Sequence, residues 1–164
     1  MNQVSRALHL LVLLPSLAVA SAQIPDEVVL DGSATPLFAE PLRARLSIAP
    51  NEGYLTIDFD PGQCSASWRG YRAFWKIEDG RLLLERVVTH PCSKTPKEVD
   101  LKRLSPSGTR PVEATWYSGV LVVPLGTAKL DQRSSSGSVY ERYAVFVVQR
   151  GKVLSRTELD EPPQ

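Results

Sequence analysis

The stretch from Tyr71 to Val88, YRAFWKIEDGRLLLERVV, has the pattern of two strands joined by a short turn. Before the turn, apolar and polar residues alternate with the two-residue period of a β-strand. Asp79-Gly80 lies between the two halves, and both residue types tolerate the positive φ angles of a tight hairpin turn. The stretch therefore predicts a β-hairpin, and the rest of the chain can be placed around it.

The turn also predicts the register of the hairpin, provided that Glu78 pairs with Arg81. The expected cross-strand pairs are then Ile77–Leu82, Trp75–Leu84, Ala73–Arg86 and Tyr71–Val88. We interpret the side that carries Tyr71 and Trp75 as core. The opposite side is a mixed surface that includes Arg72, Phe74, Lys76, Leu83, Glu85 and Val87.

The only two cysteines of the chain, Cys64 and Cys92, flank this hairpin. Extending the register brings them near each other at its open end, so we predict a disulfide between them. Closing a loop of this size stabilises a fold by about 3–4 kcal/mol in the chain-entropy view. A redox-active pair and free thiols are the alternatives, but the spacing is not that of a CxxC motif.

Residues 1–22 have the three parts of a secretory signal peptide. Arg6 charges a short polar start, Leu8 to Val19 form an apolar run, and Ala20-Ser21-Ala22 supply small residues. We expect cleavage before Gln23. The apolar run is shorter than the roughly 20 residues that span a bilayer, so we expect a periplasmic or secreted protein with no membrane anchor after cleavage. An oxidising compartment agrees with the disulfide.

Removing residues 1–22 leaves 142 residues, enough for one domain with its own core. We expect a single β-rich domain at 23–159 and a flexible tail at 160–164. This part carries 18 basic and 18 acidic side chains, interspersed along the chain. It therefore lacks the basic footprint of a nucleic-acid-binding protein, and we expect no nucleic-acid partner.

Further strands are expected at residues 42–48, 54–59, 112–117, 120–123, 139–149 and 153–157, with Ser118-Gly119 as a tight turn or a bulge. Ala144 to Val148 are apolar on both faces, which predicts a central strand covered on two sides. Thirteen prolines oppose helices, although 36–45 could form a short one. The pattern predicts an all-β fold: a single antiparallel β domain, as a sandwich, open barrel or bent meander, with at most one short helix.

Three stretches resemble a family of small, uncharacterised bacterial β-rich proteins. They are WRGYRAFWKIEDGRL at 68–82, ATWYSGVLVVPLG at 114–126 and GSVYERY at 137–143. The order and spacing of these stretches are similar to those of the family. The resemblance implies a β-rich fold; it implies no particular activity, substrate or cofactor.

No nucleophile–base set, metal-ligand cluster or phosphate-binding loop is evident in the sequence. His90 is the only histidine after residue 22 and is interpreted as a loop residue, because a zinc site usually needs three or four ligands. Asp58 and Asp60 share a strand face, but no further acidic ligands flank them. We expect a protein that is not an enzyme and has no catalytic residues, metal or cofactor.

Nine residues make up a possible interaction surface. They are Trp68, Arg69, Arg72, Lys76, Glu85, Trp116, Tyr140, Glu141 and Arg142. The tryptophans near turns could present flat apolar rings to a ligand. Arg69 could reach a carboxylate on a partner, but we favour an ion pair within the chain, for example with Glu141, or a surface position.

The sequence favours an exported, non-enzymatic domain that binds an unknown protein partner in the cell envelope, in the manner of an inhibitor or immunity protein. This hypothesis rests on the signal peptide, the small β-rich domain and the missing catalytic pattern. The alternative is a module that binds a carbohydrate or small ligand through exposed aromatic rings. That alternative fails if Trp68, Trp75 and Trp116 are all buried.

Overall fold

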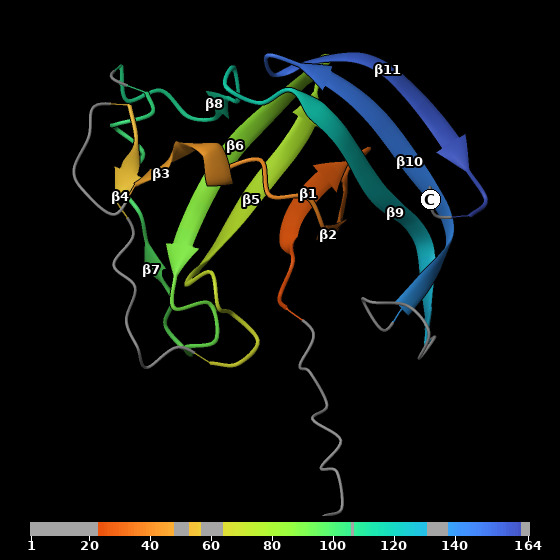
Figure 1. Ribbon diagram of the computed structural model, residues 1–164, viewed down its shortest axis with the longest axis horizontal. Coiled ribbons are helices and arrows are strands. Elements are labelled where there is room, and N and C mark those ends of the chain that lie inside the picture. The colour runs from red at the N-terminus through yellow and green to blue at the C-terminus, as the bar shows by residue number, and fades with distance from the viewer. Residues whose placement is uncertain (1–22, 48–52, 57–63, 106, 131–137, 162–164) are drawn as a thin grey trace, which may run out of the picture.

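The computed structural model describes residues 23–47, 53–56, 64–105, 107–130 and 138–161 (Figure 1). The strands are β1 (Asp26–Leu30), β2 (Ser33–Leu37), β3 (Leu46–Ser47), β4 (Leu55–Thr56), β5 (Tyr71–Glu78), β6 (Arg81–Thr89), β7 (Lys97–Glu98), β8 (Val112–Glu113), β9 (Gly119–Leu130), β10 (Ser138–Gln149) and β11 (Lys152–Leu159). The expectation of a single all-β domain is confirmed. Within the described residues, no helix is long and apolar enough to cross a membrane.

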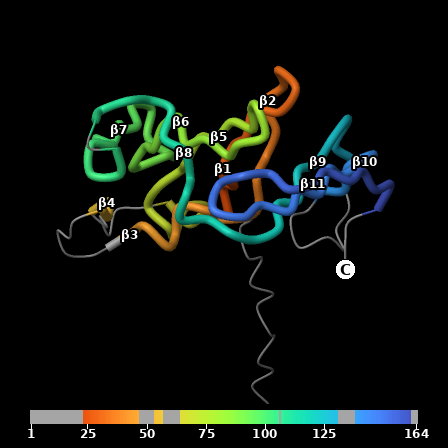
Figure 2. The backbone as a smooth tube through the Cα atoms, turned by 90° about the horizontal axis from the view of Figure 1, so that it is seen from above, coloured from red at the N-terminus to blue at the C-terminus, as the bar shows by residue number. Residues whose placement is uncertain are grey.

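The main sheet has the strand order β2-β1-β5-β6-β11-β10-β9, and β7 and β8 also pair with β6. It curves until its two ends meet, so that the architecture is a nearly closed barrel (Figures 1 and 2). At the closure, the Thr35 hydroxyl of β2 donates a hydrogen bond to the Pro124 carbonyl of β9 at 2.8 Å. The ladders are antiparallel, with the exception of β1–β5 and the separate pair β3–β4, which are parallel.

The β5–β6 hairpin has the predicted turn, but only half of the predicted register. Glu78 pairs with Arg81, Ile77 with Leu82 and Trp75 with Leu84, as expected. Beyond them a β-bulge shifts the pairing, so that Phe74 faces Arg86, Ala73 faces Val87 and Tyr71 faces Thr89. The expected pairs Ala73–Arg86 and Tyr71–Val88 are therefore wrong. The extra residue lets Leu84 and Val87 both point into the core, which strict alternation would prevent.

A second Asp-Gly turn, which the sequence analysis passed over, builds the β1–β2 hairpin. Asp31 and Gly32 have φ angles of 52° and 79°, as a two-residue hairpin turn requires. Of the short helix considered at 36–45, only a three-residue 3-10 helix at Arg43–Arg45 forms, since β2 occupies the start of this segment. Pro36 and Pro41 lack the N–H groups that a helix needs.

Two of the other expected strands are much shorter than predicted. Residues 42–48 contribute only β3, with residue 48 outside the described residues, and 112–117 contribute only β8. The second stretch leaves the sheet because Tyr117 N–H bonds back to the Ala114 carbonyl at 2.8 Å, which makes a turn. Ser118-Gly119 is neither a tight hairpin turn nor a bulge, because β9 begins at Gly119. Of 54–59, β4 is described, and residues 57–59 lie outside the described residues.

Side chains from all parts of the main sheet fill the interior of the barrel. The largest fully buried ones include Trp75, Leu84, Leu121, Phe146, Leu37 and Leu42. Tyr71, Ala73 and Trp75 are buried, so the predicted core side of β5 is confirmed. The predicted Cys64–Cys92 disulfide is present, with 6.3 Å between the two Cα atoms. It joins the segment before β5 to the segment after β6.

The two long hairpins, β5–β6 and β10–β11, are joined at their turns. β6 and β11 pair at a single position, Arg81 with Lys152. Next to it, Gly151 accepts a hydrogen bond from Leu82 N–H at 2.8 Å and donates one to the Tyr117 carbonyl at 2.9 Å. Gly151 has φ +78°, and a Cβ at this position would lie 2.9 Å from the carbonyl carbon of Ala114. The joint therefore requires glycine.

We predict that Gly151→Ala destabilises the fold more than Gly80→Ala does. Both glycines have left-handed φ angles, but a Cβ at Gly80 would meet nothing within 4 Å. Gly80→Ala should cost about 1–2 kcal/mol, the usual penalty for an L residue in this conformation. Gly151→Ala should cost at least about 2 kcal/mol more, because the Ala114 backbone must move. Urea unfolding of both variants measures the difference, and equal losses would show that the joint accommodates a side chain.

Candidate interaction surface

The outward side of the β9–β10–β11 sheet is apolar. In β10, Ala144, Phe146 and Val148 are buried in the core. Because side chains alternate along a strand, Tyr143, Val145 and Val147 point to the other side. The same alternation in β9 places Leu121 and Val123 inside and Val120, Val122 and Pro124 outside.

The cross-strand register assembles these residues into three rows. Their members, from β9 through β10 to β11, are Val120, Val147 and Ser155; Val122, Val145 and Thr157; and Pro124, Tyr143 and Leu159. We call these nine residues the outer face. It contains no charged side chain. Depletion of charge over a contiguous apolar area is what distinguishes the centre of a protein interface from ordinary surface.

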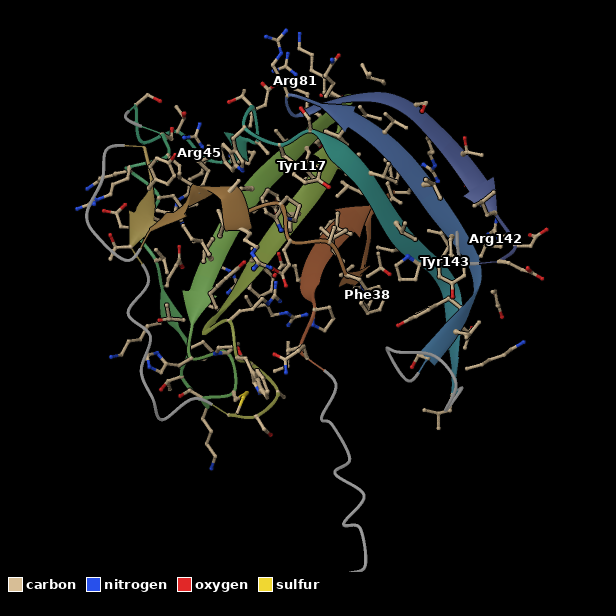
Figure 3. All side chains as sticks on the ribbon, viewed as in Figure 1. Phe38, Arg45, Arg81, Tyr117, Arg142 and Tyr143 are labelled. Carbon is tan, nitrogen blue, oxygen red and sulfur yellow. A yellow bond between two sulfur atoms is a disulfide. The ribbon has the colours of Figure 1, made fainter. Side chains whose placement is uncertain are left out.

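Part of the outer face is open to solvent. Val120 is 53% exposed, Val147 41% and Leu159 37%. Tyr143 is buried at the far end of the face, where its hydroxyl accepts a hydrogen bond from Tyr140 N–H at 3.0 Å and the two rings meet edge to face (Figure 3). The expectation that β10 is covered on both sides is therefore wrong at Val147. Within the described residues, no second layer lies over this end of the sheet.

A buried ion pair lies where β1 meets β5. The Asp26 carboxylate is fully buried and accepts hydrogen bonds from Ala73 N–H at 3.1 Å and Trp75 Nε1–H at 3.0 Å. Arg69 Nη1 lies 3.2 Å from Asp26 Oδ1 and 3.7 Å from Glu40 Oε1. The preference for an internal ion pair at Arg69 is thus confirmed, but its partners are Asp26 and Glu40, and the suggested pairing with Glu141 is wrong.

The electrostatics of this cluster follow from its burial. Burial raises the pKa of the Asp26 carboxyl above its ordinary value, and the opposing effects of Arg69 and of the hydrogen bonds from Trp75 and Ala73 do not cancel it. Burial, together with the negative Asp26 nearby, raises the pKa of Tyr71 to about 12. The Tyr71 hydroxyl is buried and has no hydrogen-bond partner within the described residues, although the Arg69 guanidinium lies 5.0 Å from the ring centroid.

On the outer side of β5–β6, the charged candidates are arranged around one another. Arg72 pairs with Glu27 at 3.1 Å and donates to the Pro25 carbonyl at 3.0 Å. Lys76 pairs with Glu78, an interaction that raises the pKa of the lysine. Glu85 is half-buried. Phe74 lies between the guanidinium groups of Arg72 and Arg86, at 5.0 and 3.9 Å from the ring centroid. Arg72 and Lys76 are therefore already paired within the chain.

The three tryptophans lie in three different environments. Trp75 is in the core. Trp116 is half-buried, donates its indole N–H to the Pro41 carbonyl at 3.0 Å and has the Arg45 guanidinium 5.6 Å from its ring. Trp68 is 77% exposed in the loop before β5, and its backbone N–H bonds to the Gln23 side chain at 2.9 Å. A flat aromatic surface made of several tryptophans is therefore not formed.

The remaining candidates lie elsewhere. Tyr140, Glu141 and Arg142 are at the start of β10, where a bulge places Glu141 next to Gly126 of β9. Arg142 pairs with Glu158 of β11 at 2.7 Å.

His90 lies in the loop after β6, with φ +54°. Asp58 and Asp60 lie outside the described residues. Within the described residues, no group of three or more potential ligand residues of the His, Cys, Asp and Glu types is placed to hold a metal ion.

The structure brings together residues that were not among the candidates predicted from the sequence. Asp26 gave no signal, because a single aspartate at the start of a strand resembles an ordinary surface residue. The outer face did give a signal, because the runs 120–123 and 144–148 are apolar at every position. Comparison with known proteins gives no further guide to the site. No family model, curated protein or solved structure matches the chain. The family resemblance noted from the sequence stays a prediction.

We predict that Asp26→Asn costs about 3–5 kcal/mol of stability, because it leaves the largely buried Arg69 without its closest partner. The matched control is Glu113→Gln, which removes the carboxylate charge from an exposed ion pair with Arg81. The control should cost at most about 1 kcal/mol. Chemical unfolding at neutral pH compares the two. Similar small losses would show that the buried pair contributes little to the fold.

We predict that Tyr71→Phe does not destabilise the protein at neutral pH, since the hydroxyl that it removes has no hydrogen bond within the described residues. The folded pKa of about 12 lies above the ordinary value of 10.0. Ionisation of Tyr71 is therefore more costly in the folded than in the unfolded state, and its contribution to stability is lost as pH rises from 10 towards 12. Unfolding curves over this interval should fall less steeply for Tyr71→Phe than for the wild type.

Proposed function

We propose that this protein is an exported, non-enzymatic domain that binds another protein through the outer face of β9–β10–β11. The proposal rests on one observation: the three rows of that face contain no charged side chain, and Val120, Val147 and Leu159 in them are open to solvent. Burying such a surface removes apolar area from water without desolvating a charge. Its partner is expected to present an apolar surface of its own, in the cell envelope.

Other surfaces support this choice of face. On the outer side of β5–β6, Arg72 and Lys76 already have ion-pair partners within the chain, so a partner protein would have to compete with these pairs. On the outer face a partner displaces only water. The disulfide between Cys64 and Cys92 supports an oxidising location, where such bonds persist. The balance of 18 acidic and 18 basic residues after residue 22 gives no reason to expect a nucleic acid.

Ligand binding through aromatic rings is the second candidate, and it rests on Trp68 alone. This ring is the most exposed of the three tryptophans. A single exposed ring can stack on a sugar, but it lacks the convergent polar groups that give a ligand site its specificity. The two proposals require different residues, so one pair of variants separates them.

We predict that Val147→Lys lowers capture of the partner at least about 10-fold, because an ammonium group would have to enter an apolar interface. Trp68→Lys is the matched control: it also replaces an exposed apolar side chain with lysine, but away from the outer face. Envelope extract is passed over wild type and both variants, and captured proteins are quantified by mass spectrometry. Circular dichroism confirms that each variant is folded.

Three results would contradict this function. Capture could fail to exceed that by an unrelated exported protein, or both variants could capture as well as the wild type. The third is loss of binding in Trp68→Lys with normal binding in Val147→Lys, which would favour the aromatic ligand site. Enrichment of the same proteins by wild type and Trp68→Lys, but not by Val147→Lys, is the result expected from the proposal.

A further inference from the structure

β11 is hydrogen-bonded to a neighbouring strand along one edge only. Its ladder with β10 runs from the pair Tyr143–Leu159 to the pair Gln149–Lys152. Along its other edge it meets β6 at Lys152 and then separates from it. From Leu154 to Leu159, no other strand of the described residues pairs with this edge, and Figure 1 shows β11 at the margin of the sheet. A free edge of this length is a template for a further strand.

Proteins commonly protect such edges with side chains of one charge, but β11 carries both signs. Arg156 and Glu158 are opposite Phe146 and Ala144 of β10, and so point to the same side of the sheet. Within the chain, Arg156 pairs with Asp31 at 2.8 Å and with Glu158 at 2.9 Å, and Glu158 also pairs with Arg142 at 2.7 Å. Two opposite charges, two positions apart on one side of an edge strand, are complementary to a second copy of the same strand.

The charges select one register for such pairing. In a two-fold antiparallel pair, the residue on the axis faces its own copy, and facing residues lie on the same side of the sheet. An axis at Arg156 would oppose two arginines, and an axis at Glu158 would oppose two glutamates. An axis at Thr157 places Arg156 opposite Glu158 of the second copy, twice.

The two neighbouring registers are also disfavoured. An axis at Ser155 would place Glu158 opposite Lys152 of the second copy, but the backbone of Lys152 is already paired with Arg81. An axis at Leu159 would oppose Glu158 and Asp160, which carry like charges. The Thr157 register is therefore the one in which the edge is free and the charges are matched.

We propose that two copies of this protein associate through antiparallel pairing of β11 about Thr157. The three-stranded β9–β10–β11 sheets of the two copies then form one six-stranded sheet. The two outer faces become continuous on one side of it. This association uses the backbone edge of β11, whereas the proposed binding of another protein uses the side chains of the outer face, so neither proposal depends on the other.

Cysteine cross-linking tests the register directly. In Thr157→Cys the two new thiols face each other across the axis, with Cα atoms about 4.5–5.5 Å apart, a separation that a disulfide can bridge. Ser155→Cys is the matched control on the same side of the strand. In the proposed register its two copies are four residues out of step, about 13 Å apart. With oxidised glutathione, Thr157→Cys should give a covalent dimer and Ser155→Cys should remain largely uncross-linked.

Charge exchange provides a second, non-covalent test. Arg156→Glu makes the inner side of the edge acidic at both positions, and Glu158→Arg makes it basic at both. Sedimentation of the wild type across a concentration series should show twice the monomer mass at high concentration. Each variant alone should dissociate at least about 10-fold more readily than the wild type, whereas an equimolar mixture should form a heterodimer.

The two tests also identify the results that overturn the proposal. A wild-type protein that sediments as a monomer at every concentration excludes the dimer. Equal cross-linking of Thr157→Cys and Ser155→Cys excludes this register. A dimer that survives in both charge variants uses another surface. Circular dichroism shows whether the charge variants are folded, and the two cysteine variants, at exposed positions outside the ion pairs, decide the register if either is not.

Discussion

The buried carboxylate of Asp26 is the interaction on which the arrangement of the strands depends. It is the point at which β1, β5 and the loop before β5 are fixed to one another, through Ala73, Trp75 and Arg69. A charge taken out of water is tolerated only when its partners are in place. The position of β1 between β2 and β5 therefore follows from a requirement for charge pairing, as well as from hydrophobic burial. Arg69 extends the constraint to the N-terminal segment by donating to the Ile24 carbonyl at 2.8 Å.

The two halves of the barrel present different outer surfaces. On β5–β6, the guanidinium groups of Arg72 and Arg86 lie over the Phe74 ring, and Lys76 pairs with Glu78. On β9–β10–β11, the outward positions are valine, proline, tyrosine, leucine, serine and threonine. Both halves contribute buried side chains to one core, so core packing alone does not explain this difference. This difference is the reason why we propose a binding surface on one half and not on the other.

Local patterns in the sequence were sufficient for the elements whose turns carry their own signal. Asp79-Gly80 predicted a turn and the three cross-strand pairs next to it. The bulge at Phe74/Trp75 could not be predicted, because it depends on which of Leu84, Glu85 and Val87 the core accepts. The contacts of Arg69 could not be predicted either, because Asp26 lies 43 positions away in the sequence. The parallel β1–β5 ladder brings the two residues together. The outer face was visible as unbroken apolar runs, but the sequence suggested that it was covered.

The closure between β2 and β9 has a consequence for the time at which the protein can fold. The hydrogen bond from Thr35 to the Pro124 carbonyl joins residues 89 positions apart, and the contact of Trp75 with Asp26 spans 49. β1 and β2 emerge first during synthesis, yet the strands that complete their surroundings are made last. Chains with such distant contacts fold slowly, because the entropy of large loops must be lost before the contacts form. The barrel therefore cannot close until β9 has been made, and until then β1 and β2 lack the strand that completes their surroundings.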